Sequence, residues 1–387
     1  MKSMLGVLFI FSFLQSSSQS VANSFFFVKT TDSLPFLKYG LGDDRLGGAK
    51  MTYLDSEVVL KVVDSSAGDY KVQLSRVHSA YIGKDKVVAT NGGKTAQHLS
   101  DSWKVWGDGD ADYVSIKLDE RLPYRSIMQI EPSRIVVDLF GVTCNTNWID
   151  QLSTAREIKN TWYEQTEDDV MRVYIALKHP QFWGYRIFYD SLNRLTIRVK
   201  RPPRFPVLSK MTIAVDAGHG GDNIGTTGST KEIQEKVYTL LIAKQLEAAL
   251  RLKKARVIMT RQKDTTLSMP ERIRFLQQKN PDLLISIHLN SSDRDTVNGV
   301  STYYRYIGFR PLSQAILKSL LQTGLHEYGN IGSFNFSLSG PTDYPNCLVE
   351  VAFLSNKGDE KKILNPKFRQ LIAKRIVAGI ETYLKEL

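Results

Sequence analysis

The stretch MTIAVDAGHGG, residues 211–221, decides how the carboxy-terminal part of this 387-residue chain folds. Its apolar first half predicts a buried strand, and the glycines after it allow a tight turn and a close approach of the backbone to a ligand. Strands that alternate with helices predict a mostly parallel α/β sheet with flanking helices. Further strands are expected at 256–260, 283–287, 300–304 and 348–352, and helices at 235–252, from Ser268 onward, at 311–324 and at 367–384.

Two histidines stand at the ends of the expected strands. His219 follows the first strand in DAGHGG, and His288 ends a later one in SIHLN. Ligands of an open parallel sheet bind at the carboxyl ends of its strands, so both side chains are expected at one edge. Glu235 opens the first helix after the glycine-rich turn and can face the same edge. Two histidines and one glutamate leave a fourth tetrahedral position for water, which is the pattern of a catalytic zinc site.

Glu350 lies inside the apolar strand LVEVA, residues 348–352. A carboxylate in a buried strand is costly without a partner, but one that faces a metal site can accept a proton from water. Each feature alone has an ordinary structural explanation, such as a glutamate that interacts with a helix dipole. Together they indicate a metal-dependent hydrolytic site. The remaining histidines, expected to be structural or surface residues, are His78, His98, His179 and His326.

Three more charged residues lie close to these motifs in the sequence. Asp216 can orient a metal ligand as a hydrogen-bond acceptor, or it can satisfy the amides of the glycine-rich turn. Arg261 and Arg272 can contact an anionic substrate, although a structural or solvated position is the favoured interpretation.

Four motifs carry a resemblance to a known family: DAGHGG at 216–221, EK at 235–236, SIHLN at 286–290 and LVEVAFLSN at 348–356. In this order they resemble the signatures of the Amidase_3 family, the zinc-dependent N-acetylmuramoyl-L-alanine amidases. The resemblance implies one zinc ion per chain, bound by His219, Glu235 and His288, with Glu350 as the catalytic glutamate. Glu232 competes for the third ligand position, but Glu235 with the helix after it matches the family's spacing.

The chain departs from the family's pattern at two places. Many relatives carry an arginine before the glutamate strand, where this sequence reads SLSGP at 337–341, which puts one substrate contact in doubt. Some relatives also insert an autoinhibitory helix between the segments that contain Gly299 and Glu350, and here that interval has little room for one. A catalytic domain over 207–387 is therefore expected to work without an activator.

Two β-rich segments precede this domain. Short strands at 34–86 predict a small barrel, and the runs GDYKV at 68–72 and AYI at 80–82 resemble bacterial SH3-like domains. Repeated alternation over 110–200 predicts a β-sandwich. The phrases at 134–141 and 193–200 resemble the AMIN domain, which targets cell-wall enzymes to the envelope. Residues 86–109 are expected to be a connector, and the proline-rich stretch 201–206 a stiff linker that few contacts cross.

The amino terminus and the composition indicate where the protein acts. Lys2, an apolar run over 4–14 and small residues up to Ala22 predict a signal peptide at 1–22, and so an exported protein in the periplasm or at the cell wall. No apolar run is long enough for a transmembrane helix. The net charge of +11 favours anionic partners, and export disfavours nucleic acid among them. Cys144 and Cys347 are too few for a disulfide scaffold.

The predicted function is an exported zinc amidase, active as a monomer, that hydrolyses peptidoglycan between the lactyl group of N-acetylmuramic acid and the L-alanine of the stem peptide. The two β modules would position it on the wall and could bind an envelope protein. One alternative is another zinc peptidase that acts on wall peptides. A second is a non-catalytic envelope-binding protein. The presence of all four residues expected for metal binding and catalysis argues against this alternative.

Overall fold

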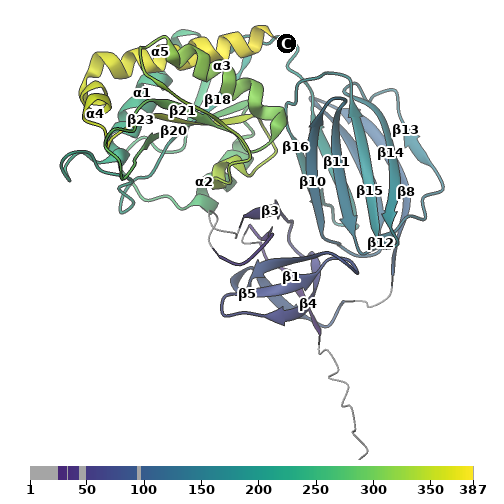
Figure 1. Cartoon of the computed structure of the whole chain (residues 1–387). Helices are drawn as coiled ribbons and strands as arrows, with labels where there is room; N and C mark the ends of the chain where they lie inside the picture. The colour runs from purple at the N-terminus through teal and green to yellow at the C-terminus, as the bar shows by residue number, and fades with distance from the viewer. Residues whose placement is uncertain (1–24, 33, 43–48, 94–96, 387) are drawn as a thin grey trace, which may run out of the picture.

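The computed structural model describes residues 25–32, 34–42, 49–93 and 97–386 (Figure 1). The expected signal peptide at 1–22 lies outside these residues. An all-β amino-terminal part precedes an α/β domain in which helices cover a central sheet. The chain is thus multidomain. Within the described ranges, no helix is both long enough and apolar enough to cross a membrane.

The first module, defined as residues 26–90, is an antiparallel sheet in the order β3-β2-β6-β5-β4-β1-β7. It extends beyond the expected segment 34–86 at both ends, because β1 pairs with both β4 and β7. β1 begins within a phenylalanine-rich run close to the expected leader, so its pattern did not mark a separate strand. The strands are β1 (Phe26–Thr30), β2 (Phe36–Lys38), β3 (Lys50–Tyr53), β4 (Val59–Ser65), β5 (Asp69–Gln73), β6 (Ser79–Gly83) and β7 (Val87–Thr90).

The second module is a sandwich of two sheets, with the orders β10-β11-β15-β14 and β12-β8-β9-β17-β16. Its first strand corrects the expected connector at 86–109: β8 occupies the second half of that segment and pairs with β9. Polar residues alternate with buried Trp103 and Val105 along β8, and this polarity made the segment look like a loop. The strands are β8 (His98–Asp108), β9 (Ala111–Leu118), β10 (Tyr124–Ile130), β11 (Ser133–Phe140), β12 (Val142–Thr143), β13 (Ile149–Gln151), β14 (Ile158–Glu167), β15 (Val170–Leu177), β16 (Tyr185–Tyr189) and β17 (Arg194–Lys200).

The carboxy-terminal domain contains a six-stranded sheet in the order β19-β18-β20-β23-β21-β22. β18, β19, β20 and β23 are parallel, whereas β21 runs antiparallel to β23. The strands are β18 (Thr212–Ala217), β19 (Arg256–Met259), β20 (Leu283–Asn290), β21 (Val300–Tyr303), β22 (Glu327–Ile331) and β23 (Asn346–Phe353). The helices are α1 (Glu235–Leu252), α2 (Met269–Lys279), α3 (Arg310–Leu321), α4 (Lys357–Leu364) and α5 (Pro366–Lys385).

Local sequence explains where these elements begin and how they pack. The Ser268 side chain accepts a hydrogen bond from the backbone N–H of Glu271, and the Glu271 carboxylate accepts one from the backbone N–H of Ser268, so α2 starts with a full capping box. The central strands are apolar on both faces because helices cover both, and Val215, Ile285 and Val349 have no exposed surface. The sequence had not marked β22 or α4.

Contacts between the modules contradict the expectation that few cross the linker. Trp183, from the sandwich, is 2% exposed and packs in the core of the α/β domain, with its ring 5.8 Å from that of Tyr383. Phe309, from the α/β domain, packs in the core that the two β modules share. The backbone N–H of Tyr185 also donates to the carbonyl of Thr342 at 2.8 Å. A short exposed linker in the sequence therefore does not mean independent domains.

Candidate metal centre

The turn that carries His219 is built from unusual backbone conformations. β18 ends at Ala217, and His219 has a φ of +60°, followed by +129° at Gly220 and +58° at Gly221. Positive φ is costly for a histidine and easy for glycine. The two glycines let the chain reverse after the strand, so that the histidine is presented at the end of the sheet.

Two buried arginines hold the carbonyl groups of this turn. Arg272 donates to the carbonyls of Ala217, at 2.9 Å, and His219, at 2.5 Å. Arg261 donates to the carbonyls of Ala217 and Gly218, both at 2.9 Å. The two side chains are 1% and 3% exposed, respectively. These contacts fit the structural role that was favoured for both arginines from the sequence. The hydrogen bonds also show that the two arginines position the His219 turn.

Asp216 neutralises Arg272 inside the sheet. Its carboxylate accepts from Arg272 and from Thr260, both at 2.6 Å, and from Ser286 at 2.7 Å. Burial favours the neutral acid, but Arg272 and the two hydroxyl groups hold the pKa of Asp216 below its ordinary value. Neither of the two roles considered for Asp216 describes these contacts, because its partners are side chains of α2, of β20 and of Thr260, which directly follows β19.

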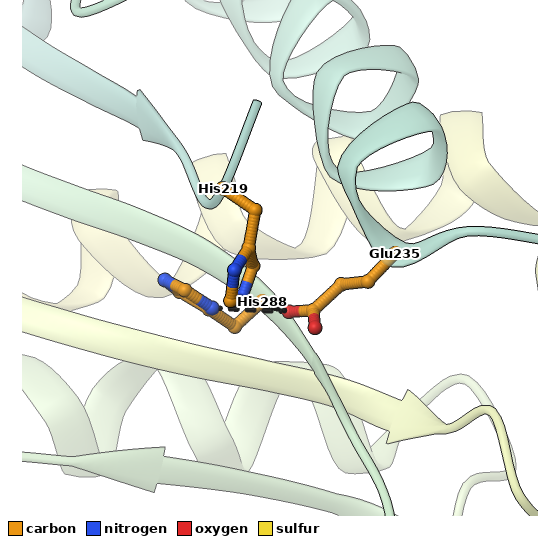
Figure 2. A group of neighbouring side chains, drawn as sticks. All are labelled: His219, Glu235 and His288. Carbon is orange, nitrogen blue, oxygen red and sulfur yellow. Dashed lines mark hydrogen bonds and ion pairs between the residues drawn. The ribbon is translucent and has the colours of Figure 1, made fainter. Parts of the chain in front are cut away.

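The carboxylate of Glu235 points toward both histidines (Figure 2). Its Oε1 is 3.1 Å from Nε2 of His219 and 3.0 Å from Nδ1 of His288. The Oε2 atom accepts from the backbone N–H of Thr226 at 2.8 Å, which fixes the carboxylate. The side chain is 3% exposed, at the first residue of α1. In the described part of the chain these three residues form a group whose ligand atoms lie within 4.8 Å of one another.

The chemistry of this group fits a zinc ion. In a tetrahedral site with bonds of about 2.0–2.1 Å the donor atoms are roughly 3.3 Å apart, close to the distances observed. The Nδ1 atom of His219 is 2.8 Å from Oδ1 of Asn223, an acceptor, which leaves Nε2 to face the ion. Two glycines keep the site open. A Cβ on Gly218 would lie 2.4 Å from the His288 ring, and one on Gly225 would lie 2.3 Å from Oε2 of Glu235.

The electrostatics of the site favour a positive charge at its centre. Burial acts to raise the pKa of Glu235, but its bonds to the two histidines outweigh burial and hold that pKa well below its ordinary range. Burial acts to lower the pKa of His288. The carboxylates of Glu235, Glu350 and Asp216 outweigh burial and raise this pKa to about 9. The carboxylates therefore attract a cation, which a bound metal ion would supply.

Glu350 lies beside this group on the neighbouring strand. It is the register partner of His288 in the parallel pair of β20 and β23, so both side chains leave the sheet on the same face. It is 8% exposed, and its charge contributes to the raised pKa values of His288 and Tyr303. Glu232, by contrast, is exposed in the loop before α1 and does not belong to the group.

Sequence reasoning missed an aromatic wall next to the histidines, which consists of Tyr303, Phe334 and Phe336. The ring of Phe336 is nearly parallel to that of His288, with centroids 6.3 Å apart. Phe334 lies 4.4 Å from Phe336, and both rings pack on Tyr303. The alternation of two phenylalanines in SFNFS, residues 333–337, was the signal available in the sequence.

The other histidines contact carboxylates elsewhere or lie at the surface. His78 pairs with Glu167 at 2.7 Å, and His98 with Asp119 at 2.9 Å. His179 pairs with Glu157, while His326 is exposed.

Comparisons with known proteins match two parts of the chain. A family model described as N-acetylmuramoyl-L-alanine amidase matches residues 213–382, and one described as AMIN domain matches residues 102–199. The probable cell wall amidase LytH of Staphylococcus saprophyticus is 33% identical over 195 residues, 50% of this chain and 65% of that protein. The protein of the same name from Staphylococcus aureus is 32% identical over 177 residues, 46% of this chain and 59% of that protein. The chain thus spans less than two thirds of these curated relatives.

Two solved structures are similar in sequence to part of the chain. The catalytic domain of CwlV, an N-acetylmuramoyl-L-alanine amidase from Bacillus (Paenibacillus) polymyxa, is 31% identical, with 45% of this chain and 98% of that chain covered and a TM-score of 0.44. An N-acetylmuramoyl-L-alanine amidase from Clostridium difficile 630 is also 31% identical, with 45% and 97% covered and a TM-score of 0.43.

Proposed function

Residues 213–382 belong to the N-acetylmuramoyl-L-alanine amidase family, and on that premise we propose that the protein is a zinc-dependent peptidoglycan amidase. It hydrolyses the amide bond between the lactyl group of N-acetylmuramic acid and the L-alanine of the stem peptide. The observation that carries the proposal is the convergence of His219, Glu235 and His288 at one edge of the sheet, inside the matched region.

One zinc ion per chain would be held by Nε2 of His219, a carboxylate oxygen of Glu235 and Nδ1 of His288. When bound, zinc would supply Lewis-acid chemistry, which means polarisation of the scissile carbonyl and a lower pKa of the attacking water. The chain supports this chemistry by fixing the ligands in advance. Asn223 orients His219, the backbone of Thr226 holds Glu235, and Arg261 with Arg272 anchors the histidine turn.

Glu350 acts as the general base and then as the general acid. Its carboxylate takes a proton from the attacking water and delivers it to the amine of L-alanine as the amide bond breaks. Two features of its position support this role. Glu350 leaves the sheet on the same face as His288, and it is outside the group of three close ligands. The aromatic wall covers one side of His288 and would limit the access of bulk water.

The two β modules position the enzyme on its substrate. The match of residues 102–199 to the AMIN domain supports a role in the cell envelope. The antiparallel first module is proposed to be an SH3-like barrel, and either module could bind an envelope protein. The protein is exported, acts in the periplasm or at the cell wall during wall remodelling or daughter-cell separation, and functions as a monomer on peptidoglycan.

Metal removal tests this function. The purified protein is expected to contain one zinc ion per chain. A strong chelator should remove the zinc and abolish activity, which is measured as the release of soluble material from peptidoglycan. Added zinc should restore both. His288→Ala, which deletes one ligand, should lose metal and activity together. Full activity of a preparation shown to be free of metal would contradict the proposal.

A further inference from the structure

The aromatic wall depends on a loop that follows β22. Residues 332–336 carry two of its three rings, Phe334 and Phe336, and lie between β22 and a short turn of 3₁₀ helix, Ser337–Ser339. The loop is held to its own domain by the backbone of Phe334, which donates to the carbonyl of Tyr304 at 3.2 Å. Because Phe336 stacks on His288, the position of this loop sets one side of the metal centre.

Arg305 joins this loop to the first module. One guanidinium nitrogen, Nη1, donates to Oδ1 of Asn335 at 2.7 Å, between the two phenylalanines. The other, Nη2, donates to the carbonyl of Lys50 and lies 3.5 Å from that of Met51. One half-buried side chain therefore holds the loop and a strand of the first module at the same time.

The strand that Arg305 contacts has an edge available for such bonds. β3 is the terminal strand of the first module, and among the described strands it pairs with β2 alone. It lies on the side of the first module that faces the α/β domain (Figure 1). A guanidinium group is planar and offers several donors in a fixed fork, so it can bridge a side-chain amide and backbone carbonyls. A lysine has one ammonium group and cannot hold the same two partners in that geometry.

A second contact supports the same connection from the far end of the loop. The hydroxyl group of Tyr53, the last residue of β3, lies 3.5 Å from the carbonyl of Ser337. The Tyr53 ring also packs on Gly340, where an added Cβ would lie 2.6 Å from it. β3 is thus connected to this segment at two points: to Asn335 through Arg305, and to Ser337 and Gly340 through Tyr53.

We propose that Arg305 is a positioning residue through which the first module sets the aromatic wall of the metal centre. The first module is then part of the catalytic unit, in addition to any contact it makes with the wall polymer. The effect on catalysis rests on the proposed function, whereas the mechanical connection between β3 and the loop does not. The experiment therefore needs one readout that is independent of activity.

Hydrogen exchange of the full-length protein gives that readout. Arg305→Gln removes a charged hydrogen-bond donor, and the backbone amides of the loop, residues 332–336, should exchange about tenfold faster. Arg305→Lys should give an intermediate increase, because it keeps the charge and can reach one partner. Asn335→Ala breaks the same bond from the other side and should also speed exchange in the loop. The double variant should exchange no faster than either single variant, because the two residues share one bond.

The matched control is Arg274→Gln. Arg274, on α2, also donates to a carbonyl of the first module, that of Asp32, and no hydrogen bond or ion pair of the described structure joins it to loop residues 332–336. It should leave amide exchange in the loop, residues 332–336, unchanged. Equal exchange in wild type and Arg305→Gln would overturn the proposal. So would the same increase in Arg274→Gln, since the loop would then respond to any loosening of the modules.

Kinetics on soluble muropeptide test the catalytic consequence. Arg305→Gln should lower kcat/KM about tenfold with unchanged zinc content, and Arg274→Gln should not. If loop exchange rises and zinc stays while kcat/KM is unchanged, the wall is not positioned for catalysis and the proposal fails. If wild type does not cleave muropeptide at all, the proposed function fails, and the exchange result still decides whether Arg305 couples β3 to the loop.

Discussion

At the scale of single residues, the metal centre is a set of strained and buried groups that hold one another. His219 sits at a positive φ because Arg261 and Arg272 bind the carbonyls around it. The identity of the three close residues could be predicted from the sequence, since strand-end histidines and a helix-start glutamate meet at one edge. Arg261, Arg272 and Asn223 could not be placed in the same way, because their partners are backbone and side-chain atoms of other elements.

Glu350→Gln should separate metal binding from catalysis. The amide keeps the size of the side chain but cannot accept the proton of the attacking water, so turnover should fall by roughly 10²-fold or more. Zinc content should stay at one per chain, because Glu350 lies outside the ligand group. The matched control is Glu232→Gln at the exposed glutamate, which should change neither. Loss of zinc from Glu350→Gln, with activity restored by excess metal, would make Glu350 a ligand.

Gly218→Ala should damage the site through one methyl group. The new Cβ would lie 2.4 Å from the His288 ring, so the ring has to leave its position beside Glu235 or the turn has to shift, and zinc affinity should fall by at least tenfold. Gly68→Ala is the control, because a Cβ at Gly68 meets nothing within 4 Å. Zinc titration followed by metal analysis measures the zinc affinity of both variants. An unchanged affinity in Gly218→Ala would mean that His288 is not held at this position when metal binds.

At the scale of elements, the sequence marks those whose pattern is strong. The apolar strands of the α/β domain and α2, with its capping box at Ser268, follow from periodicity and end signals. β8 and β1 were not expected. In β8, exposed polar residues alternate with buried ones, and β1 begins in a phenylalanine-rich run without alternation. Their place depends on pairing with distant strands, which local patterns do not encode.

The docking of α2 on β18 depends on the buried pair of Arg272 and Asp216. Asp216→Asn leaves the guanidinium buried without its counter-charge and should destabilise the domain by about 3–5 kcal/mol at pH 7. The pKa of Asp216 is lowered in the folded protein, so its charge stabilises the fold above the unfolded value of about 3.9. That stabilisation is lost as the pH falls through the folded value.

Urea unfolding at several pH values measures this difference. The gap between wild type and Asp216→Asn should be full at pH 7 and should narrow below about pH 4. A gap that widens on acidification would contradict the assigned direction of the shift.

At the scale of the whole molecule, the three parts form one packed unit. Trp183 enters the core of the α/β domain, and Lys200 of the sandwich pairs with Asp282 at 3.0 Å. A fragment over 207–387 would therefore lose contacts that the full chain makes, which weakens the expectation that it works alone. Such packing between modules could not be predicted from the linker's composition, because it depends on surfaces that only the folded modules create.

The proposed amidase activity predicts which chemical ends the full-length protein creates in peptidoglycan. Purified wall is digested with the zinc-loaded protein, and the products are identified by mass spectrometry, with His288→Ala as the control. The predicted products are stem peptides with a free amino group on L-alanine and glycan strands that keep the lactyl group of N-acetylmuramic acid. New ends inside the stem peptide, with the bond between lactyl group and L-alanine intact, would contradict the amidase and indicate a peptidase.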